Sequence, residues 1–524
     1  MACTQGRIDA GNPPINLEDT LTHLPSLVGQ SLMFRFLGPE FTVADRKAFN
    51  AIRPAGVLFF GDNLISREQI QGLTRQLQAA ARDEGMPPLL IAADQEGGIV
   101  TRLPADMITV PSAMGLGFLA TESIRESARI NARQLREVGI NMNYAPTADI
   151  NNNPHNPVIR TRSFGETAEV VSNAVVATIA GHLEEGVVPT VKHFPGHGNT
   201  HVDSHHGLPV IDSSLDELRQ MELVPFVAAI AANVPAVMTA HILFPALDDR
   251  PATLSNRILT GLLREELGFD GLIVTDSMSM EAIARDWGLE EAAILAKQAG
   301  VDLLESSEGP ESMLARHAAL MAAVENGRLD ISVFTATAER VDTLRQRFDI
   351  GEALPGESDV ERIRETAQAL AKRTIRTASG AAVPVIPNEP DTVIVAFARL
   401  RNLEVVDRFD LPSVMEQSLR THLPAATVIT ISGEHTVEEC DAALATVAEA
   451  NTLVVATRDA IQHTYQQDIG ARLMAAAPAT ATRIHVNLRG PYDAGLLGNV
   501  DETVFTYGDA VVSLRALASA LAGA

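Results

Sequence analysis

The chain has 524 residues, a length that predicts two or three domains and excludes a single small binding module. It carries 41 lysines and arginines against 66 aspartates and glutamates, which gives a formal net charge of −25. That charge repels polyanions, so we expect no nucleic-acid partner and no binding to an acidic membrane surface. The hydrophobic fraction of 46% with 20% charged residues is typical of a globular chain. The expected partner is therefore a small or neutral molecule.

Cysteine usage and the apolar runs bear on the compartment. The sequence contains Cys3 and Cys440, whose separation matches no metal-binding or redox spacing. Its first residues have neither the basic nor the apolar region of a signal peptide, and no run of 18 or more apolar residues occurs. These features predict a soluble, cytoplasmic protein.

From residue 56 onward, short β-branched runs alternate with longer amphipathic stretches, as expected for repeated βα units. The helical stretches end at glycines that would turn the chain back into a strand, namely Gly85, Gly139, Gly186, Gly268 and Gly300. Seven apolar runs are present, at 56–60, 89–94, 141–145, 187–193, 236–241, 271–276 and 301–305. An eighth strand could come from residues 31–37. The pattern predicts an α/β fold with a (β/α)8 TIM-type barrel over roughly residues 15–350, within a first domain of residues 1–350.

The pattern changes after Gly351. Residues 351–384 read as a linker with a connecting helix, because polar and proline-rich stretches flank one helical segment. A second alternation follows, with predicted strands at 392–397, 427–431, 453–457, 484–488 and 504–507. Residues 385–524 therefore read as a smaller α/β sandwich domain.

Ionisable residues follow several of the apolar runs. They are Asp94, Asp149, Lys192 with His193, His241 and Asp276. Each carboxylate could simply cap the next helix, but in a barrel the carboxyl ends of the strands build the active site. Asp276 follows a rigid apolar strand, which is a suitable position for a nucleophile.

The segment 192–209 contains five histidines, four of them spaced every four residues. On a helix they would form a metal-binding face, but Pro195, Gly196 and Gly198 make a continuous helix improbable. We therefore expect no metal and no cofactor, and interpret the segment as a loop that carries acid/base groups. Within it, Asp203 and His205 are spaced so that the carboxylate can hydrogen-bond the imidazole, which suits proton transfer near neutral pH.

Several motifs of this sequence resemble a known family. They are KHFPGHG at 192–198, DSH at 203–205, LP at 208–209, DQEGG at 94–98, NPVI at 156–159, RSFG at 162–165, MTAH at 238–241 and GFDGLIVTDSMSM at 268–280. In this order they are similar to family 3 glycoside hydrolases of the β-N-acetylglucosaminidase type. The resemblance covers the barrel, and a two-domain form with an α/β C-terminal domain also occurs in that family.

The resemblance implies a role for individual residues. Asp276 would be the nucleophile and Asp203 with His205 the acid/base dyad. Substrate hydroxyls and the acetamido group would be bound by Asp94, Arg102, Arg162, Lys192 and His193. The implied reaction is retaining hydrolysis of terminal β-linked N-acetylglucosamine through a covalent glycosyl-enzyme. The substrate would be a small carbohydrate from cell-wall or chitin fragments, as in peptidoglycan recycling.

The sequence departs from the family pattern at three positions. Ile99 and Arg160 replace a common arginine and a common glycine, and Asn199 stands where aspartate is usual. We expect Arg160 to narrow or charge the aglycone side of the site. The C-terminal domain contains no assignable motif, so its expected role is structural or substrate-trimming.

Three other functions remain open from the sequence. Phosphorolysis is the nearest, because a histidine acid/base tolerates attack of phosphate on the glycosyl-enzyme. A metal-dependent amidohydrolase would use the histidines as ligands instead. A non-catalytic sugar-binding protein is the least favoured, because Asp276, Asp203 and His205 are all present.

Overall fold

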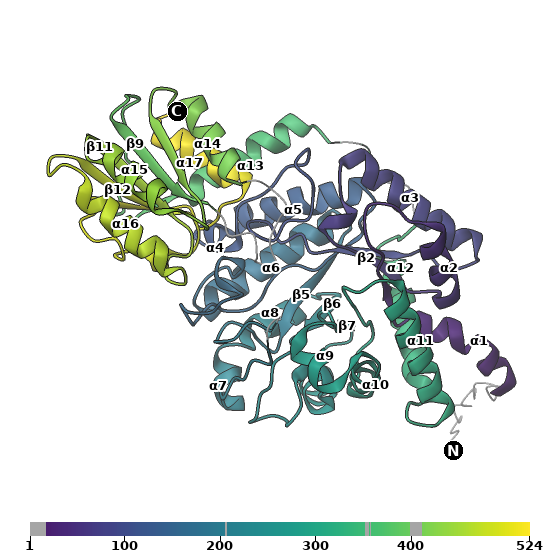
Figure 1. Ribbon diagram of the computed structural model, residues 1–524. Helices are drawn as coiled ribbons and strands as arrows, with labels where there is room; N and C mark the ends of the chain where they lie inside the picture. The colour runs from purple at the N-terminus through teal and green to yellow at the C-terminus, as the bar shows by residue number, and fades with distance from the viewer. Residues whose placement is uncertain (1–16, 205–206, 352–355, 357, 399–410) are drawn as a thin grey trace, which may run out of the picture.

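The computed structural model describes residues 17–204, 207–351, 356, 358–398 and 411–524. Two β-sheets with surrounding helices organise these residues (Figure 1). The first sheet is parallel, curled and built from the first part of the chain. The second is mixed and lies beyond α4 and α5 in the view of Figure 1. The chain is therefore an α/β protein with two sheets.

The first sheet has seven strands that pair in sequence order. They are β1 (Met33–Phe34), β2 (Gly56–Phe59), β3 (Leu90–Ala93), β4 (Met142–Asn143), β5 (Val188–Phe194), β6 (Ala236–Thr239) and β7 (Leu272–Val274). Every pairing is parallel; Val57 lies opposite Ile91, for example. The predicted run at 301–305 contributes parallel bridges to both edges, from Leu303 to Val274 and from Leu304 to Leu32. This segment therefore links β7 to the start of β1.

The side chains of these strands alternate between two apolar layers, as the period of two requires. Leu58 and Leu90 belong to an inner cluster with Met142, whereas Val57 and Ile91 pack against the surrounding helices. Both layers are fully buried. A parallel sheet covered on both faces explains why the strands read as continuous apolar runs in the sequence.

Helices follow the strands of the first sheet and cover its outer face. They are α1 (Leu17–Gly29), α2 (Val43–Ile52), α3 (Arg67–Asp83), α4 (Ala113–Leu116), α5 (Thr121–Glu137), α6 (Ala168–Glu184), α7 (Leu215–Gln220), α8 (Val224–Ala231), α9 (Glu281–Trp287), α10 (Leu289–Ala299), α11 (Pro310–Glu325) and α12 (Ser332–Arg347). Short 3-10 turns η1 (Gly61–Asn63), η2 (Arg160–Arg162) and η3 (Ala252–Leu254) and the π-helical η4 (Arg257–Glu266) complete this part. The five glycines predicted to end helices all have positive φ, from 64° at Gly85 to 105° at Gly300, the conformation that glycine adopts without steric cost.

The second sheet has the strand order β10-β9-β11-β12-β13-β8. Its strands are β8 (Arg376–Thr377), β9 (Thr392–Phe397), β10 (Thr427–Ile431), β11 (Thr452–Thr457), β12 (Thr482–Asn487) and β13 (Glu502–Phe505). All neighbours are parallel except β13 and β8, which are antiparallel. The strands lie within two residues of the predicted positions. Strand β8 was not predicted, because two residues are too short to show a period.

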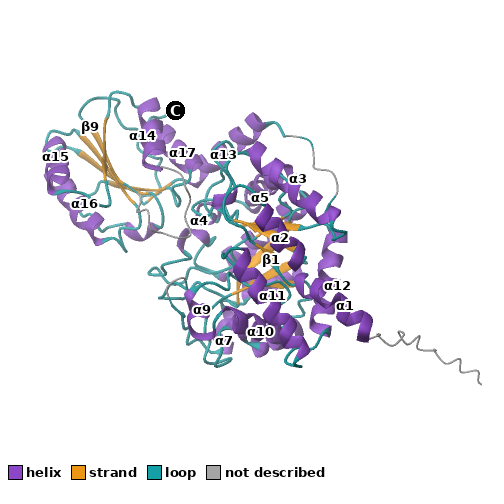
Figure 2. Ribbon diagram, turned by 45° about the vertical axis from the view of Figure 1, so that its right-hand side comes forward, coloured by secondary structure: helices purple, strands orange, loops and turns teal. Residues whose placement is uncertain are grey.

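Helices cover both faces of the second sheet (Figure 2). On one face, Ile394 packs with α13 (Val360–Thr374), α14 (Leu411–His422) and α17 (Val511–Leu521). On the other, Val393 packs with α15 (Val437–Val447) and α16 (Thr464–Ala476). The expected connecting helix within 351–384 is thus α13, and it joins the apolar core of the second sheet through Leu370 and Ala371.

The described residues contain no candidate for a membrane-spanning helix. None of their helices is both long enough and apolar enough to cross a bilayer.

A buried histidine connects α6 to the first sheet. The Nδ1–H of His182 donates to the Thr178 carbonyl at 2.9 Å, and its Nε2 accepts from the Asn143 amide at 2.9 Å. Burial lowers the pKa of His182 to about 4, since the charged ring is disfavoured away from water. The native state therefore resists taking up a proton at this position.

This burial predicts acid sensitivity. The unfolded chain protonates His182 near pH 6.5, whereas the native state does so only near pH 4, so the free energy of unfolding falls as the pH drops through this window. In urea titrations, His182→Gln should reduce that fall by up to about 3 kcal/mol. Substitution of the exposed His23 by Gln serves as the control and should leave the fall unchanged. Identical pH dependence in wild type and His182→Gln would contradict the assignment.

Candidate active site

A cavity of about 770 Å³ lies at the carboxyl ends of the strands of the first sheet. Its lining comes from the loops after these strands, where a barrel enzyme places its chemistry. Of the predicted site residues, it brings together Asp94, Arg102, Arg162, Lys192, His193 and Asp276. These six side chains therefore line one cavity, and their individual roles stay a prediction.

Buried cations and carboxylates line part of the cavity. The Lys192 Nζ lies 2.6 Å from Asp94 Oδ1 and 2.7 Å from Glu96 Oε1. Arg162 binds both oxygens of Glu96, at 2.9 and 2.8 Å. Burial opposes ionisation of Glu96, yet Arg162 and Lys192 together hold its pKa well below the usual range. Glu96 is thus a permanent anion that positions two cations.

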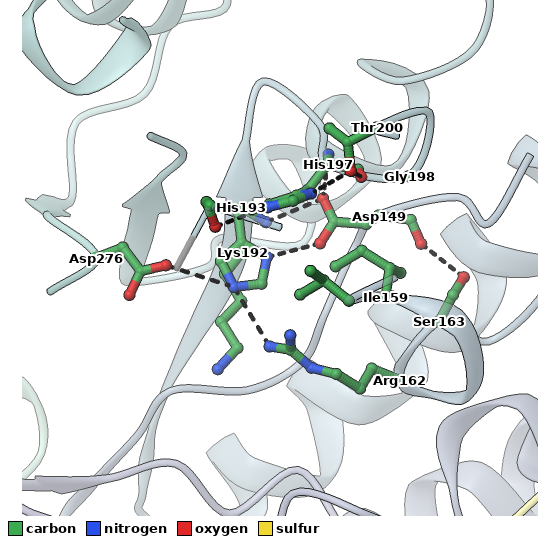
Figure 3. A network of polar contacts seen from close by, with 12 residues as sticks. Asp149, Ile159, Arg162, Ser163, Lys192, His193, His197, Gly198, Thr200 and Asp276 are labelled. Atoms are coloured by element: carbon green, nitrogen blue, oxygen red, sulfur yellow. Dashed lines mark hydrogen bonds and ion pairs between the residues drawn. The ribbon is translucent and has the colours of Figure 1, made fainter. Parts of the chain in front are cut away.

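His193 occupies the centre of the site (Figure 3). Its Nδ1–H donates to Asp149 Oδ2 at 2.7 Å, and its Nε2 lies 3.4 Å from Arg162 Nη2 and 4.0 Å from Asp276 Oδ2. Asp149 is fully buried, and His193 helps to keep its pKa low despite the desolvation that raises it. Asp149 also accepts from the backbone N–H of His197 at 2.7 Å. The buried aspartate therefore fixes the ring of His193.

Asp276 follows β7 and is the least buried carboxylate of the group, with 24% of its side chain exposed. The backbone N–H of Ser277 donates to its Oδ1 at 2.7 Å. The ring of His241, also predicted from its position after a strand, contacts the Ser277 carbonyl through Nε2 at 3.0 Å. His241 thus supports the backbone beside Asp276. An accessible carboxylate on a supported strand end is suited to attack a substrate.

A further carboxyl group, Glu305, lines the cavity and was not predicted. Burial and the nearby charges of Asp94 and Asp276 raise its pKa well above the usual value. The phenol of Tyr144 lies near it, and burial with the Glu305 charge raises the pKa of Tyr144 too. Glu305 ends the apolar run 301–305, so the rule that selected Asp94 could have found it. Glu96 could also have been predicted from the sequence, because it lies in the DQEGG motif.

The histidine-rich loop also contributes to the lining of the cavity, through His193, His197 and Ser204. His197 contacts Thr200 Oγ1 at 3.0 Å through Nδ1 and Ser204 Oγ at 3.2 Å through Nε2. Asp203 is half-buried beside Ser204, which lines the cavity. His205 lies outside the described residues, so its pairing with Asp203 stays a prediction.

The described histidines of the loop have separate partners. His193 contacts Asp149, His197 contacts Thr200, and His201 contacts Asn153 at 3.2 Å. In the part of the chain that the structure describes, no group of three or more His, Cys, Asp or Glu could hold a metal ion.

The expectation for Arg160 was wrong. Its side chain is buried and points to Asp459, which it meets at 2.8 Å, and it does not line the cavity. A residue close in sequence to a site residue can point away from the site, because successive side chains of a 3-10 turn project about 120° apart. Arg160 therefore neither narrows nor charges the aglycone side.

The Glu96 network predicts a large stability cost when its anion is removed. Glu96→Gln leaves Arg162 as a buried charge without a carboxylate, which should lower the free energy of unfolding by about 3 to 5 kcal/mol. The measurement is urea unfolding at pH 7. The matched control is Glu291→Gln, which breaks an even shorter but exposed pair with Arg328 and should change little. Equal losses in the two variants would show that burial does not set the cost.

Comparisons with known proteins support the resemblance. The beta-hexosaminidase A of Pseudoalteromonas piscicida is 42% identical over 267 residues, 47% of this chain and 45% of that relative, so this chain spans less than half of its length. The beta-hexosaminidase of Stenotrophomonas maltophilia strain K279a is 32% identical over 328 residues, 60% of this chain and 96% of that relative. The solved structure of a glycoside hydrolase family 3 beta-N-acetylglucosaminidase from Paenibacillus sp. str. FPU-7 matches with a TM-score of 0.88 at 35% identity, covering 95% of this chain and 96% of that chain.

A family model provides the assignment itself. The model described as the glycosyl hydrolase family 3 N terminal domain matches residues 28–344, more than half of the chain. This range contains every strand of the first sheet and every described residue of the site. The chain therefore belongs to glycosyl hydrolase family 3 and is a glycoside hydrolase.

Proposed function

We propose that this chain is a retaining glycosidase that removes terminal, non-reducing β-linked N-acetylglucosamine from small carbohydrates. The carrying observation is the accessible Asp276 carboxylate, 4.0 Å from the His193 ring at the edge of a buried network of cations. The names of the relatives, beta-hexosaminidase and beta-N-acetylglucosaminidase, support the substrate class. The cytoplasm is the proposed location.

In this mechanism Asp276 attacks the anomeric carbon and forms a covalent glycosyl-enzyme, while His205 gives a proton to the departing oxygen. His205 then takes a proton from water, which releases the sugar from Asp276. Asp203 orients the His205 ring and stabilises its charged form. His193 stays fixed by Asp149 and leaves Nε2 toward Asp276 and the substrate.

The remaining cavity residues would bind the sugar. Lys192 and Arg162 are charged donors held by Glu96, and Asp94 is an acceptor beside them. Sugar hydroxyls both donate and accept, so this mixture matches them. Arg102, whose backbone N–H donates to Gln95 Oε1 at 2.9 Å, lines the cavity mouth and would contact the acetamido group or a hydroxyl.

We propose further that the chain forms two domains, a (β/α)8 barrel of residues 1–350 and a sandwich domain of 385–524, joined by 351–384. The bridges of Leu303 and Leu304 to both edges of the first sheet support eight segments in the barrel. Separate apolar clusters in the two sheets support the division.

The direct test compares aryl β-glycosides of N-acetylglucosamine and glucose, each with and without inorganic phosphate. We expect release of the aryl group from the N-acetylglucosaminide, with free sugar as the product in both buffers. A sugar 1-phosphate that forms when phosphate is present would instead establish the phosphorylase alternative. Preference for the glucoside would overturn the proposed substrate.

Replacement of the nucleophile should stop turnover without unfolding the chain. Asp276→Asn should lower kcat by more than about a hundredfold, since the covalent step contributes several kcal/mol to catalysis. The partial exposure of Asp276 predicts an unchanged melting temperature. Retention of more than about a hundredth of the wild-type kcat counts against the role, as does labelling of another residue by a 2-fluoro glycoside.

The acid/base assignment predicts a dependence on the leaving group. His205→Ala should impair substrates with poor leaving groups most, because a nitrophenolate departs with little proton assistance whereas a sugar alkoxide does not. Asp203→Asn should show a milder form of the same trend. Steady-state rates across aryl glycosides of graded leaving-group pKa measure it.

For an activated aryl substrate, the glycosyl-enzyme should accumulate in His205→Ala and produce a burst. A small anion such as azide should then restore turnover, because it attacks without a general base. Equal losses for all leaving groups, together with no rescue by azide, would exclude His205 as the acid/base.

A further inference from the structure

The loop that carries Arg162 lies between the cavity and the second sheet. Its 3-10 turn η2 begins with Arg160, whose φ of +44° is uncommon for a residue with a side chain. The Arg160 N–H donates to Asn151 Oδ1 at 2.9 Å, and its guanidinium lies 2.8 Å from Asp459 Oδ1. Arg162, two residues later, contacts Glu96 and His193 instead, and Figure 3 shows its approach to the His193 ring. One short turn thus links two buried charge networks.

Asp459 is firmly held on the side of the second sheet. It follows β11, and its other oxygen binds Arg489 at 2.8 Å. Arg489 in turn binds Asp509 at 3.2 Å, which also pairs with Arg458 at 3.1 Å. Burial would raise the pKa of Asp459, but Arg160 and Arg489 keep it below its usual value. The anion that faces Arg160 is therefore fixed by the carboxyl edge of the second sheet.

Other contacts attach the same loop to the second sheet. The Asn151 amide donates to the Tyr492 hydroxyl at 2.6 Å, and that hydroxyl donates to Glu166 at 2.5 Å. The Gln462 amide donates to the Asn156 carbonyl at 3.3 Å. These contacts flank η2 on both sides, and the Arg160–Asp459 pair is the buried charged contact between them.

We propose that Arg160 and Asp459 are positioning residues for the cavity: their ion pair makes the second sheet hold η2 so that Arg162 stays aligned toward Glu96, His193 and the sugar. This inference rests on the proposed glycosidase function. In this proposal the C-terminal part of the chain supports substrate binding through Arg162, while none of its own described residues lines the cavity.

The physical reason is the cost of a buried charge. Without Asp459, Arg160 is a buried cation without a carboxylate, so it must move toward water. Such movement changes the backbone of a three-residue turn, and Arg162 belongs to that turn. A displacement of about 1 Å at a substrate-binding group can lower a rate by as much as about a hundredfold.

The test is a mutant cycle on the full chain with an aryl β-glycoside of N-acetylglucosamine. Asp459→Ala and Arg160→Ala should each lower kcat/KM at least about tenfold, mainly through a higher KM. The double variant should be no worse than the poorer single variant, because both act in one pair. In an Arg162→Ala background, Asp459→Ala should have no further effect on kcat/KM.

Arg264→Ala is the matched control, because it breaks a buried pair of 2.6 Å with Asp302 at the amino-terminal end of β7, away from the cavity. It should lower the melting temperature and leave KM unchanged. If Asp459→Ala does not fold, Asp459→Asn replaces it, with a smaller rise in KM expected.

Two results would overturn the inference: an unchanged KM in folded Asp459 variants, or a full additional loss in the Arg162→Ala background. Failure of the proposed function is seen separately, since the wild type itself would then not cleave the N-acetylglucosaminide.

Discussion

Burial of Lys192 and Arg162 is the constraint on which the site depends. Both side chains are almost inaccessible, and a buried cation without an anion is strongly unfavourable. Glu96 contacts both, so one carboxylate holds both cations at the cavity. As the proposed sugar-binding groups, they would act in a medium of low polarity, where a charge attracts substrate oxygens more strongly than in water. The loops that follow the strands of the first sheet bring these cations and carboxylates together.

The same constraint recurs where the two sheets meet. Arg160, Arg458 and Arg489 are buried together with Asp459 and Asp509 at the carboxyl edge of the second sheet. In parallel sheets this edge is where loops converge and polar groups collect. The loop 150–166 thus has charged partners from both sheets: Arg162 pairs with Glu96, and Arg160 pairs with Asp459.

Much of this organisation could be predicted from the sequence, for identifiable reasons. Apolar runs predict buried parallel strands, and a polar residue after each run predicts Asp94, Lys192 and Asp276, because strand ends converge. The direction of Arg160 could not be predicted, since its partner Asp459 is about 300 residues away in the sequence. Strand β8 was missed because its two residues pair with β13 through tertiary contacts alone.

The charge balance of the cavity also bears on why a histidine would suit the proposed acid/base role. Asp94, Glu96 and Asp149 each have a neighbouring cation or imidazole, and Asp276, 4.0 Å from the His193 ring, is the most exposed of the four carboxylates. Burial and the charges of Asp94 and Asp276 raise the pKa of Glu305, which disfavours a further negative charge there. A second ionised carboxylate at the mouth would repel the Asp276 anion and raise its pKa, which weakens the nucleophile. A histidine changes between neutral and positive forms instead, so in the proposed mechanism it adds no negative charge beside Asp276 before that carboxylate attacks the sugar.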